Sequence, residues 1–158
     1  MKKAFISAVC ALCLSAPLAS MAQETPPPTA TPMVLSIAPA GDVVLDDFMW
    51  LNRVVVVFAD NPRDPAFQRQ LELLAERPEV LAERDVIVLT DADPSAKSPV
   101  RTTLRPRGFS LVIVDKDSRV MLRKPDPWDV REISRAIDKT PLRQQEVREA
   151  NESARSGG

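Results

Sequence analysis

Three polar side chains follow an apolar run in the stretch NRVVVVFADNPRD, residues 52–64. Asp60, Asn61 and Arg63 offer a carboxylate, an amide and a guanidinium, which can hydrogen-bond a polar ligand. If the apolar run is a strand and a helix begins after Asp64, these side chains lie at the sheet edge where ligands gather in open α/β sheets. Asp, Asn and Pro are also ordinary turn formers, so a purely connecting turn is the alternative.

A second candidate set is basic and surrounds a strand predicted at the edge of the sheet. Its members are Arg119, Arg123, Lys124 and Arg143. Such cations can recognise an anionic glycan, a lipid headgroup or a carboxylate. Charges on an edge strand also discourage aggregation between strands, so edge protection is the alternative for this basic strip.

The N-terminal segment has the pattern of a secretory signal peptide. A basic pair precedes the apolar run 4–19, and Ser20-Met21-Ala22 supplies small residues at the positions that a signal peptidase reads. We expect cleavage after Ala22 and a periplasmic or secreted mature protein. A retained membrane anchor is the alternative, but a spanning helix needs about 20 apolar residues, so we expect no membrane span in the mature protein.

The side chains that the mature chain lacks narrow its chemistry. The sequence has no histidine and no tyrosine, and both cysteines, Cys10 and Cys13, leave with the signal peptide. A thiolate nucleophile is therefore excluded, as are Ser-His and Cys-His pairs. Zinc, copper and haem lose their usual ligands, and the loop aspartates lack the twelve-residue pattern of a calcium loop. We expect no metal site and no cofactor.

Net charge argues against nucleic acid as a partner. The formal charge of the full sequence is −1, and residues 1–22 carry two lysines and no acidic residue. The mature chain is therefore weakly acidic, at about −3, and lacks the basic surface that nucleic acid binding requires.

Apolar patterning predicts the elements that position these residues. Continuous apolar runs indicate buried strands, and an alternating run indicates a half-exposed edge strand. Asp64 followed by Pro65 predicts a helix start, with Phe67, Leu71 and Leu74 as the buried stripe. The predicted strands are 54–58, 86–89, 111–114 and 119–123; the other predicted helices are 100–104 and one capped at Asp126-Pro127 and stopped by Pro141.

The element order is β-α-β-α-β-β-α. A helix between the first two strands implies a right-handed parallel crossover, and the short turn 115–118 implies an antiparallel hairpin. The order predicts a thioredoxin-like α/β fold with a mixed four-stranded sheet in the order 2-1-3-4. A further N-terminal strand at 33–37 is possible, and another α/β sandwich with the same strand count is the alternative.

Composition divides the mature chain into three parts. Residues 23–41 form a Pro-rich leader, residues 42–142 form the thioredoxin-like domain, and residues 143–158 form a polar tail that is partly disordered. Within the domain we expect Trp50 to anchor the core, because an indole buries a large apolar area. We expect Arg84 and Asp85 to have a structural role.

An ordered set of stretches resembles a bacterial exported domain of unknown function in the thioredoxin-like P-DUDES group. The stretches are FMWLNRVVVVFADN, FQRQLELL, LAERDVIVL, GFSLVIVDKDSRVMLRKPDP and IDKTPLRQQE. The resemblance covers residues 42–147. It implies kinship with C-terminal modules of sushi-repeat and equarin-type extracellular proteins, and a role in adhesion or matrix binding rather than catalysis.

The sequence departs from working thioredoxins at two places. The turn after the first strand has no cysteine, and Gly108-Phe109-Ser110 occupies the stretch where thioredoxins place a cis-proline, so Ser110 replaces that proline. Because dithiol–disulfide exchange requires an attacking thiolate, redox catalysis by the mature chain is excluded.

Two function classes remain open. The first is a non-catalytic binding module for an envelope protein, a glycan or an anionic small ligand. The second is a hydrolase or transferase that uses carboxylates or Ser110, with no identifiable mechanism. A concave pocket at the 59–63 turn that holds a buried carboxylate of raised pKa would favour the enzyme.

Overall fold

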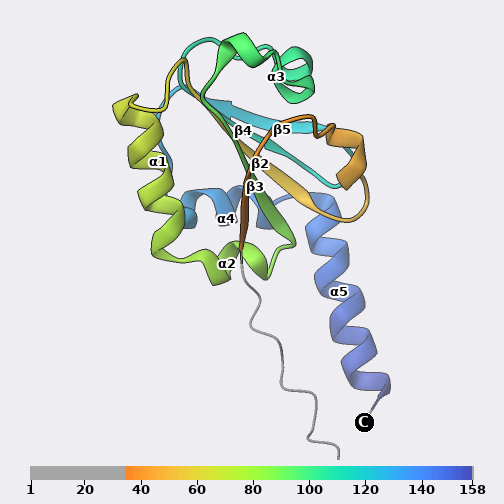
Figure 1. Cartoon of the computed structure of the whole chain (residues 1–158). Coiled ribbons are helices and arrows are strands. Elements are labelled where there is room, and N and C mark those ends of the chain that lie inside the picture. The colour runs from red at the N-terminus through yellow and green to blue at the C-terminus, as the bar shows by residue number, and fades with distance from the viewer. Residues whose placement is uncertain (1–34, 158) are drawn as a thin grey trace, which may run out of the picture. The chain divides into compact units, whose positions relative to one another are not determined.

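The computed structural model describes residues 35–157, so the signal peptide predicted for residues 1–22 and most of the leader lie outside the described residues. Within that range the chain forms a five-stranded mixed sheet in the order β1-β3-β2-β4-β5 (Figure 1). The strands are β1 (Ser36–Pro39), β2 (Arg53–Phe58), β3 (Val86–Asp91), β4 (Ser110–Val114) and β5 (Val120–Lys124).

The sheet confirms the predicted core order. β3 pairs parallel with β1 and β2, whereas β4 pairs antiparallel with β2 and β5. The predicted first strand is β2, which lies at the centre with every residue buried. The possible N-terminal strand is present as β1, slightly later than predicted, and it forms the edge beside β3.

Helices cover both faces of the sheet (Figure 1). One face packs against α1, α2 and α4, and the other against α3 and the short helix η1, as the two apolar core clusters show. The helices are η1 (Leu45–Phe48), α1 (Pro65–Glu76), α2 (Pro78–Ala82), η2 (Pro94–Ala96), α3 (Pro99–Leu104), α4 (Val130–Asp138) and α5 (Pro141–Ser156). Since the central strands have apolar residues on both faces, both must be covered.

Two predicted helix starts have different outcomes. The cap at Asp64 is confirmed, because its Oδ1 accepts hydrogen bonds from the backbone N–H groups of Ala66 and Phe67 at 2.8 and 3.1 Å. The cap predicted at Asp126 is wrong. Helix α4 starts after Asp129, whose carboxylate accepts from the N–H of Glu132 at 2.7 Å, while Glu132 reaches back to the N–H of Asp129. This reciprocal capping box satisfies two free donors at once.

The C-terminal segment is more regular than expected. Helix α5 starts after the cap residue Thr140 and runs to Ser156, so the tail predicted as partly disordered is helical over most of its length. No α5 residue is fully buried, and the contacts of this helix with the domain include the ion pairs of Arg143 and Glu146. Among residues 35–157, no helix is both long and apolar enough to cross a bilayer.

Trp50 does not anchor the core as predicted. Its side chain is 64% exposed, and its backbone has a φ of +64°. The N–H of Trp50 donates to the carbonyl of Lys116 at 2.7 Å, which fixes the backbone in a tight turn before β2. Because this turn holds the residue at the domain surface, the indole stays outside both core clusters.

Candidate functional site

The turn after β2 presents its three predicted site residues to solvent. Asp60, Asn61 and Arg63 are all exposed. The Oδ1 of Asn61 accepts from the N–H of Arg63 at 2.9 Å, and its carbonyl accepts from the N–H of Asp64 at 3.2 Å. Asn61 therefore shapes the turn itself, whereas the exposed charged groups of Asp60 and Arg63 are accessible to a ligand.

An open groove of about 650 Å³ runs beside this turn. It lies at the carboxyl ends of the parallel strands β1, β2 and β3, next to the start of α1, where ligands bind in open α/β sheets. Its apolar walls and polar rim consist of Pro39, Asp60, Asn61, Pro62, Phe67, Leu71, Thr90, Ala92 and Asp93. We call this feature the turn groove.

The buried carboxylate next to the turn groove belongs to Asp91, at the end of β3. It accepts hydrogen bonds from Arg101 Nε and Nη2 at 3.0 and 2.8 Å and from Ser98 Oγ at 2.5 Å. Burial raises the pKa of Asp91, but the bonds from Arg101 and Ser98 outweigh burial and hold the pKa below its ordinary value. This carboxylate is ionised at neutral pH and is not a general acid.

Arg101 joins the ends of two strands to α3. Its Nη2 also donates to the carbonyl of Ala59 at 2.7 Å, and its guanidinium lies 5.3 Å from the ring centre of Phe58. The sequence analysis missed this residue. The sequence does contain a sign of the helix that carries Arg101, because Ser98-Pro99 repeats the cap-plus-proline pattern of Asp64-Pro65. Ser98 caps this helix, α3.

Ser110 lies close to the turn but lacks the partners of a nucleophile. It begins β4 opposite Phe58, the last residue of β2 before the turn. Among residues 35–157, no carboxylate accepts a hydrogen bond from the Ser110 hydroxyl. A nucleophilic serine needs an adjacent base, so this geometry gives the hydrolase alternative no support.

Arg123 reaches the same end of the sheet as Ser110. Both residues line a cavity of about 220 Å³ together with Lys124. Arg123 Nη1 donates to the carbonyl of Leu104 at 2.7 Å, and Lys124 Nζ lies 4.1 Å from the centre of the Trp128 ring. Both cations therefore have a structural contact within the domain, at the end of α3 and before α4.

The predicted basic strip is divided between the two ends of the sheet. Lys124 pairs with Leu111 in the β4–β5 register, which places Arg123 and Lys124 at the end near the turn groove. Arg143 instead lies on α5 and pairs with Glu146 at 3.1 Å. Arg123 and Lys124 therefore lie at the opposite end of the sheet from Arg143, which contacts the Arg53 partner Glu146.

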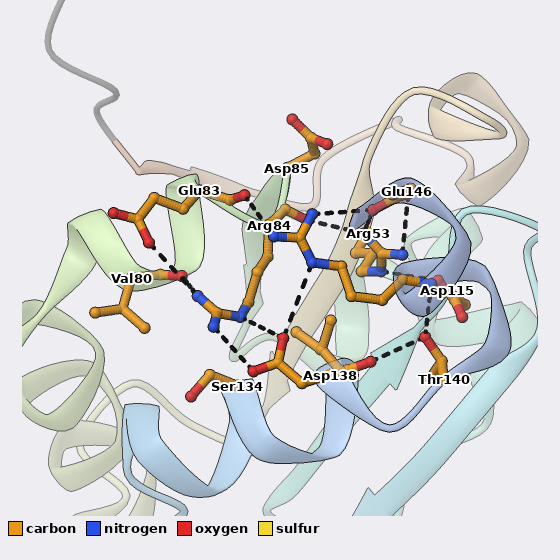
Figure 2. Close-up of polar contacts among 12 residues, drawn as sticks. Arg53, Val80, Glu83, Arg84, Asp85, Asp115, Ser134, Asp138, Thr140 and Glu146 are labelled. Atoms are coloured by element: carbon orange, nitrogen blue, oxygen red, sulfur yellow. Dashed lines mark hydrogen bonds and ion pairs between the residues drawn. The ribbon is translucent and has the colours of Figure 1, made fainter. Parts of the chain in front are cut away.

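A buried ion cluster occupies the end of the sheet opposite the turn groove (Figure 2). Arg53 is fully buried, and it donates to Asp115 at 2.9 Å and in two bonds to Glu146 at 3.1 Å. Lys116 and Arg143 also contact Glu146, each at 3.1 Å. These contacts join β2, the β4–β5 turn and α5.

Charge pairing lowers the pKa of Glu146. Burial raises the pKa of Glu146, but the hydrogen bonds from Arg53, Lys116 and Arg143 outweigh burial and lower the pKa to about 2. Because removal of one partner would leave a buried charge uncompensated, we assign the cluster to the attachment of α5. The sequence analysis did not single out Arg53, whose partner Glu146 lies 93 positions away.

Arg84 and Asp85 have separate structural partners. Arg84 makes two hydrogen bonds of 2.9 Å to Asp138 on α4 (Figure 2), whereas Asp85 pairs with Lys116 at 2.7 Å. Neighbours in the sequence thus join different elements.

Comparisons with known proteins give one family match and several structural neighbours, of which the first supports the fold. The profile of a family described as a domain of unknown function (DUF4174) matches residues 44–146. The structure of reduced 2-Cys peroxiredoxin from Plasmodium vivax matches 61% of this chain and 81% of its own, at 16% identity and a TM-score of 0.50. Chloroplastic thioredoxin z matches 67% of this chain and 93% of its own, at 16% identity and a TM-score of 0.48. The search of curated proteins finds no match.

Proposed function

This chain belongs to the DUF4174 family, and from that premise we propose that it is an exported, non-catalytic binding module of the cell envelope. The turn groove is its binding site. The observation that carries this proposal is an apolar groove with a polar rim beside a carboxylate whose hydrogen bonds are all internal.

The lining of the turn groove favours binding over catalysis. Phe67, Leu71 and Ala92 provide apolar contact, and Asp60 and Asp93 provide acceptors at the rim. Binding sites of this kind combine apolar walls with a few orienting polar groups. A catalytic site would instead need a group with a pKa tuned for proton transfer, and the pKa of Asp91 is lowered by its internal hydrogen bonds.

The rim chemistry indicates the kind of partner. Two carboxylates face a site with apolar walls, so a suitable ligand carries an apolar side chain flanked by N–H donors or a cation. An extended segment of an envelope protein meets both requirements. The adhesive role implied by the resemblance to extracellular modules agrees with this partner.

Site-specific photo-crosslinking in cells tests the turn groove. A photoreactive residue at the exposed position of Asn61 should capture a partner, whereas the same residue at Glu152, exposed near the end of α5, should not. Asp60→Arg should reduce capture, and Glu152→Arg should leave it unchanged because it makes the same charge change far from the groove. Equal capture from both positions, or none from position 61, would contradict the proposal.

Export can be tested by expressing the full sequence, including residues 1–22, and measuring the mass of the product. Intact mass of the protein from the soluble envelope fraction should correspond to a chain that starts at Gln23. A mass that retains residues 1–22, found in the membrane pellet, would exclude the exported soluble form.

A further inference from the structure

A second cavity, of about 420 Å³, lies at the end of the sheet opposite the turn groove. Trp50 forms part of its wall, with the side chain 64% exposed. The lining residues are Trp50, Asp115, Asp117, Arg119, Met121, Thr140, Pro141, Leu142 and Gln145. Neither the proposed binding role of the turn groove nor the core of the domain uses this indole.

The backbone of Trp50 is in a conformation that large side chains rarely adopt. Its φ of +64° lies in the left-handed region, which disfavours residues that carry a Cβ. Strained positions of this kind concentrate at binding sites. An exposed tryptophan held in a strained turn contributes little to core packing, so ligand contact is the best explanation for the indole here.

A hydrogen-bond acceptor and a hydrogen-bond donor line the same cavity as the indole. Oδ1 of Asp115 accepts from Arg53 and from the N–H of Lys116, while Oδ2 has no hydrogen-bond donor among the described residues. Arg119 is 86% exposed and has one long contact, of 3.4 Å, with Asp117. The cavity therefore offers a free carboxylate oxygen and a free guanidinium edge.

The charges around the cavity balance. Asp115 is paired with buried Arg53 at 2.9 Å, and Asp117 is paired with Arg119. A balanced lining neither attracts nor repels an ion strongly, so it favours a neutral ligand. Met121 and Leu142 add apolar contact beside the indole.

We propose that this cavity binds a neutral saccharide ring. The indole of Trp50 stacks on the apolar C–H face of the sugar, Asp115 accepts a hydrogen bond from one hydroxyl, and Arg119 donates to another. A sugar ring has the required combination of one apolar face and a rim of hydroxyl groups, each both donor and acceptor. The proposal does not depend on the turn groove being a binding site.

Tryptophan fluorescence tests this proposal directly, because the chain has two tryptophans. In the Trp128→Phe variant the emission comes from Trp50 alone. The neutral trisaccharides maltotriose, cellotriose and N,N′,N″-triacetylchitotriose are titrated to about 10 mM, a range that reaches millimolar affinities. At least one should shift the Trp50 emission saturably, and Arg119→Ala should weaken that binding about tenfold, as expected when a hydrogen bond to a charged group is lost.

Leu51→Ala is the matched control. Leu51 is 66% exposed beside Trp50 but does not line the cavity, so its removal should leave the saccharide affinity unchanged. Trp50→Ala, followed by calorimetry, should abolish binding while circular dichroism shows an intact fold. The proposal is overturned if no saccharide shifts the emission. It is also overturned if Leu51→Ala weakens binding as much as Arg119→Ala, because Leu51 does not line the cavity.

Discussion

Two aspartates at the start of α1 have different roles at the scale of single residues. Asp64 caps the helix through Ala66 and Phe67, whereas Asp60 is exposed on the turn. We expect Asp64→Ala to lower the free energy of unfolding by about 1 kcal/mol, the usual effect of losing a cap. Asp60→Ala should change it by less than about 0.5 kcal/mol, as surface substitutions do.

Denaturant melts of the single variants measure both effects, and Arg63→Ala serves as a second surface control. If Asp60→Ala or Arg63→Ala destabilises the protein as much as Asp64→Ala, the turn is structural. In that case the turn groove loses its support as a binding site.

The strain at Trp50 can be measured separately from any ligand. Trp50→Gly and Trp50→Ala both remove the indole, but only glycine adopts a φ of +64° without strain. We therefore expect Trp50→Gly to be more stable than Trp50→Ala by about 1 kcal/mol. Thermal and urea unfolding of the two variants give the difference.

Leu51 provides the control for that comparison, because it is not among the residues with positive φ. There the order should reverse, with Leu51→Gly less stable than Leu51→Ala. Equal stability of Trp50→Gly and Trp50→Ala would show that the turn does not strain the backbone.

At the scale of elements, the attachment of α5 depends on one carboxylate. Glu146 contacts Arg53, Lys116 and Arg143, and its pKa falls from 4.5 to about 2. Since folding lowers this pKa, the stabilisation is complete above about pH 4.5 and is lost as the pH falls towards 2. We expect Glu146→Gln to destabilise the protein by about 2 kcal/mol at pH 7.

Urea melts at pH 7 and at pH 3 check this pH dependence. The difference between wild type and Glu146→Gln should shrink at pH 3. Glu149→Gln on the same helix is the control, because Glu149 is exposed and bonds only to Gln145, and it should change stability by less than about 0.5 kcal/mol. A difference for Glu146→Gln that stays constant between pH 7 and pH 3 would contradict the assigned ion pairing.

Local patterns in the sequence predicted the strands better than they predicted the residue that caps each helix. The runs around Val54–Phe58 and Leu111–Val114 are apolar without interruption, and a central strand is the natural outcome for such runs. In contrast, the sequence analysis placed the cap at Asp126-Pro127, whereas Asp129 caps α4. The signal for Asp129 is Glu132 three positions later, whose side chain returns to the N–H of the cap residue.

The candidate sites were predicted only in part, for a physical reason. The location of Asp60 and Asn61 at the edge of the sheet could be predicted, because it depends only on the apolar run that precedes them in the sequence. The Arg53–Glu146 pair joins segments far apart in the chain, and side-chain exposure at Trp50 depends on a backbone bond to Lys116. Neither can be read from composition or periodicity.

At the scale of the whole molecule, the thioredoxin-like frame separates two surfaces. The parallel strands end at the turn groove, and the β4–β5 turn, α5 and Trp50 surround the cavity of about 420 Å³ at the other end. The ion pairs of Arg53 lie beneath the second surface and join α5 to the sheet. This separation means that variants at one surface can be tested without disturbing the other.

Redox proteins with a thioredoxin-like fold catalyse disulfide exchange, and the mature chain should not. Material comprising residues 23–158 has no cysteine, and disulfide exchange needs a thiolate to attack the disulfide. We therefore expect its rate of insulin reduction with dithiothreitol to equal that of the buffer blank, while a thioredoxin measured in parallel shows a clear rate. Intact mass must first confirm that residues 1–22 are absent, because Cys10 and Cys13 would otherwise supply thiols. A rate clearly above the blank from such cysteine-free material would mean that this frame supports disulfide reduction by a route other than a protein thiolate, and the interpretation as a non-redox module would fail.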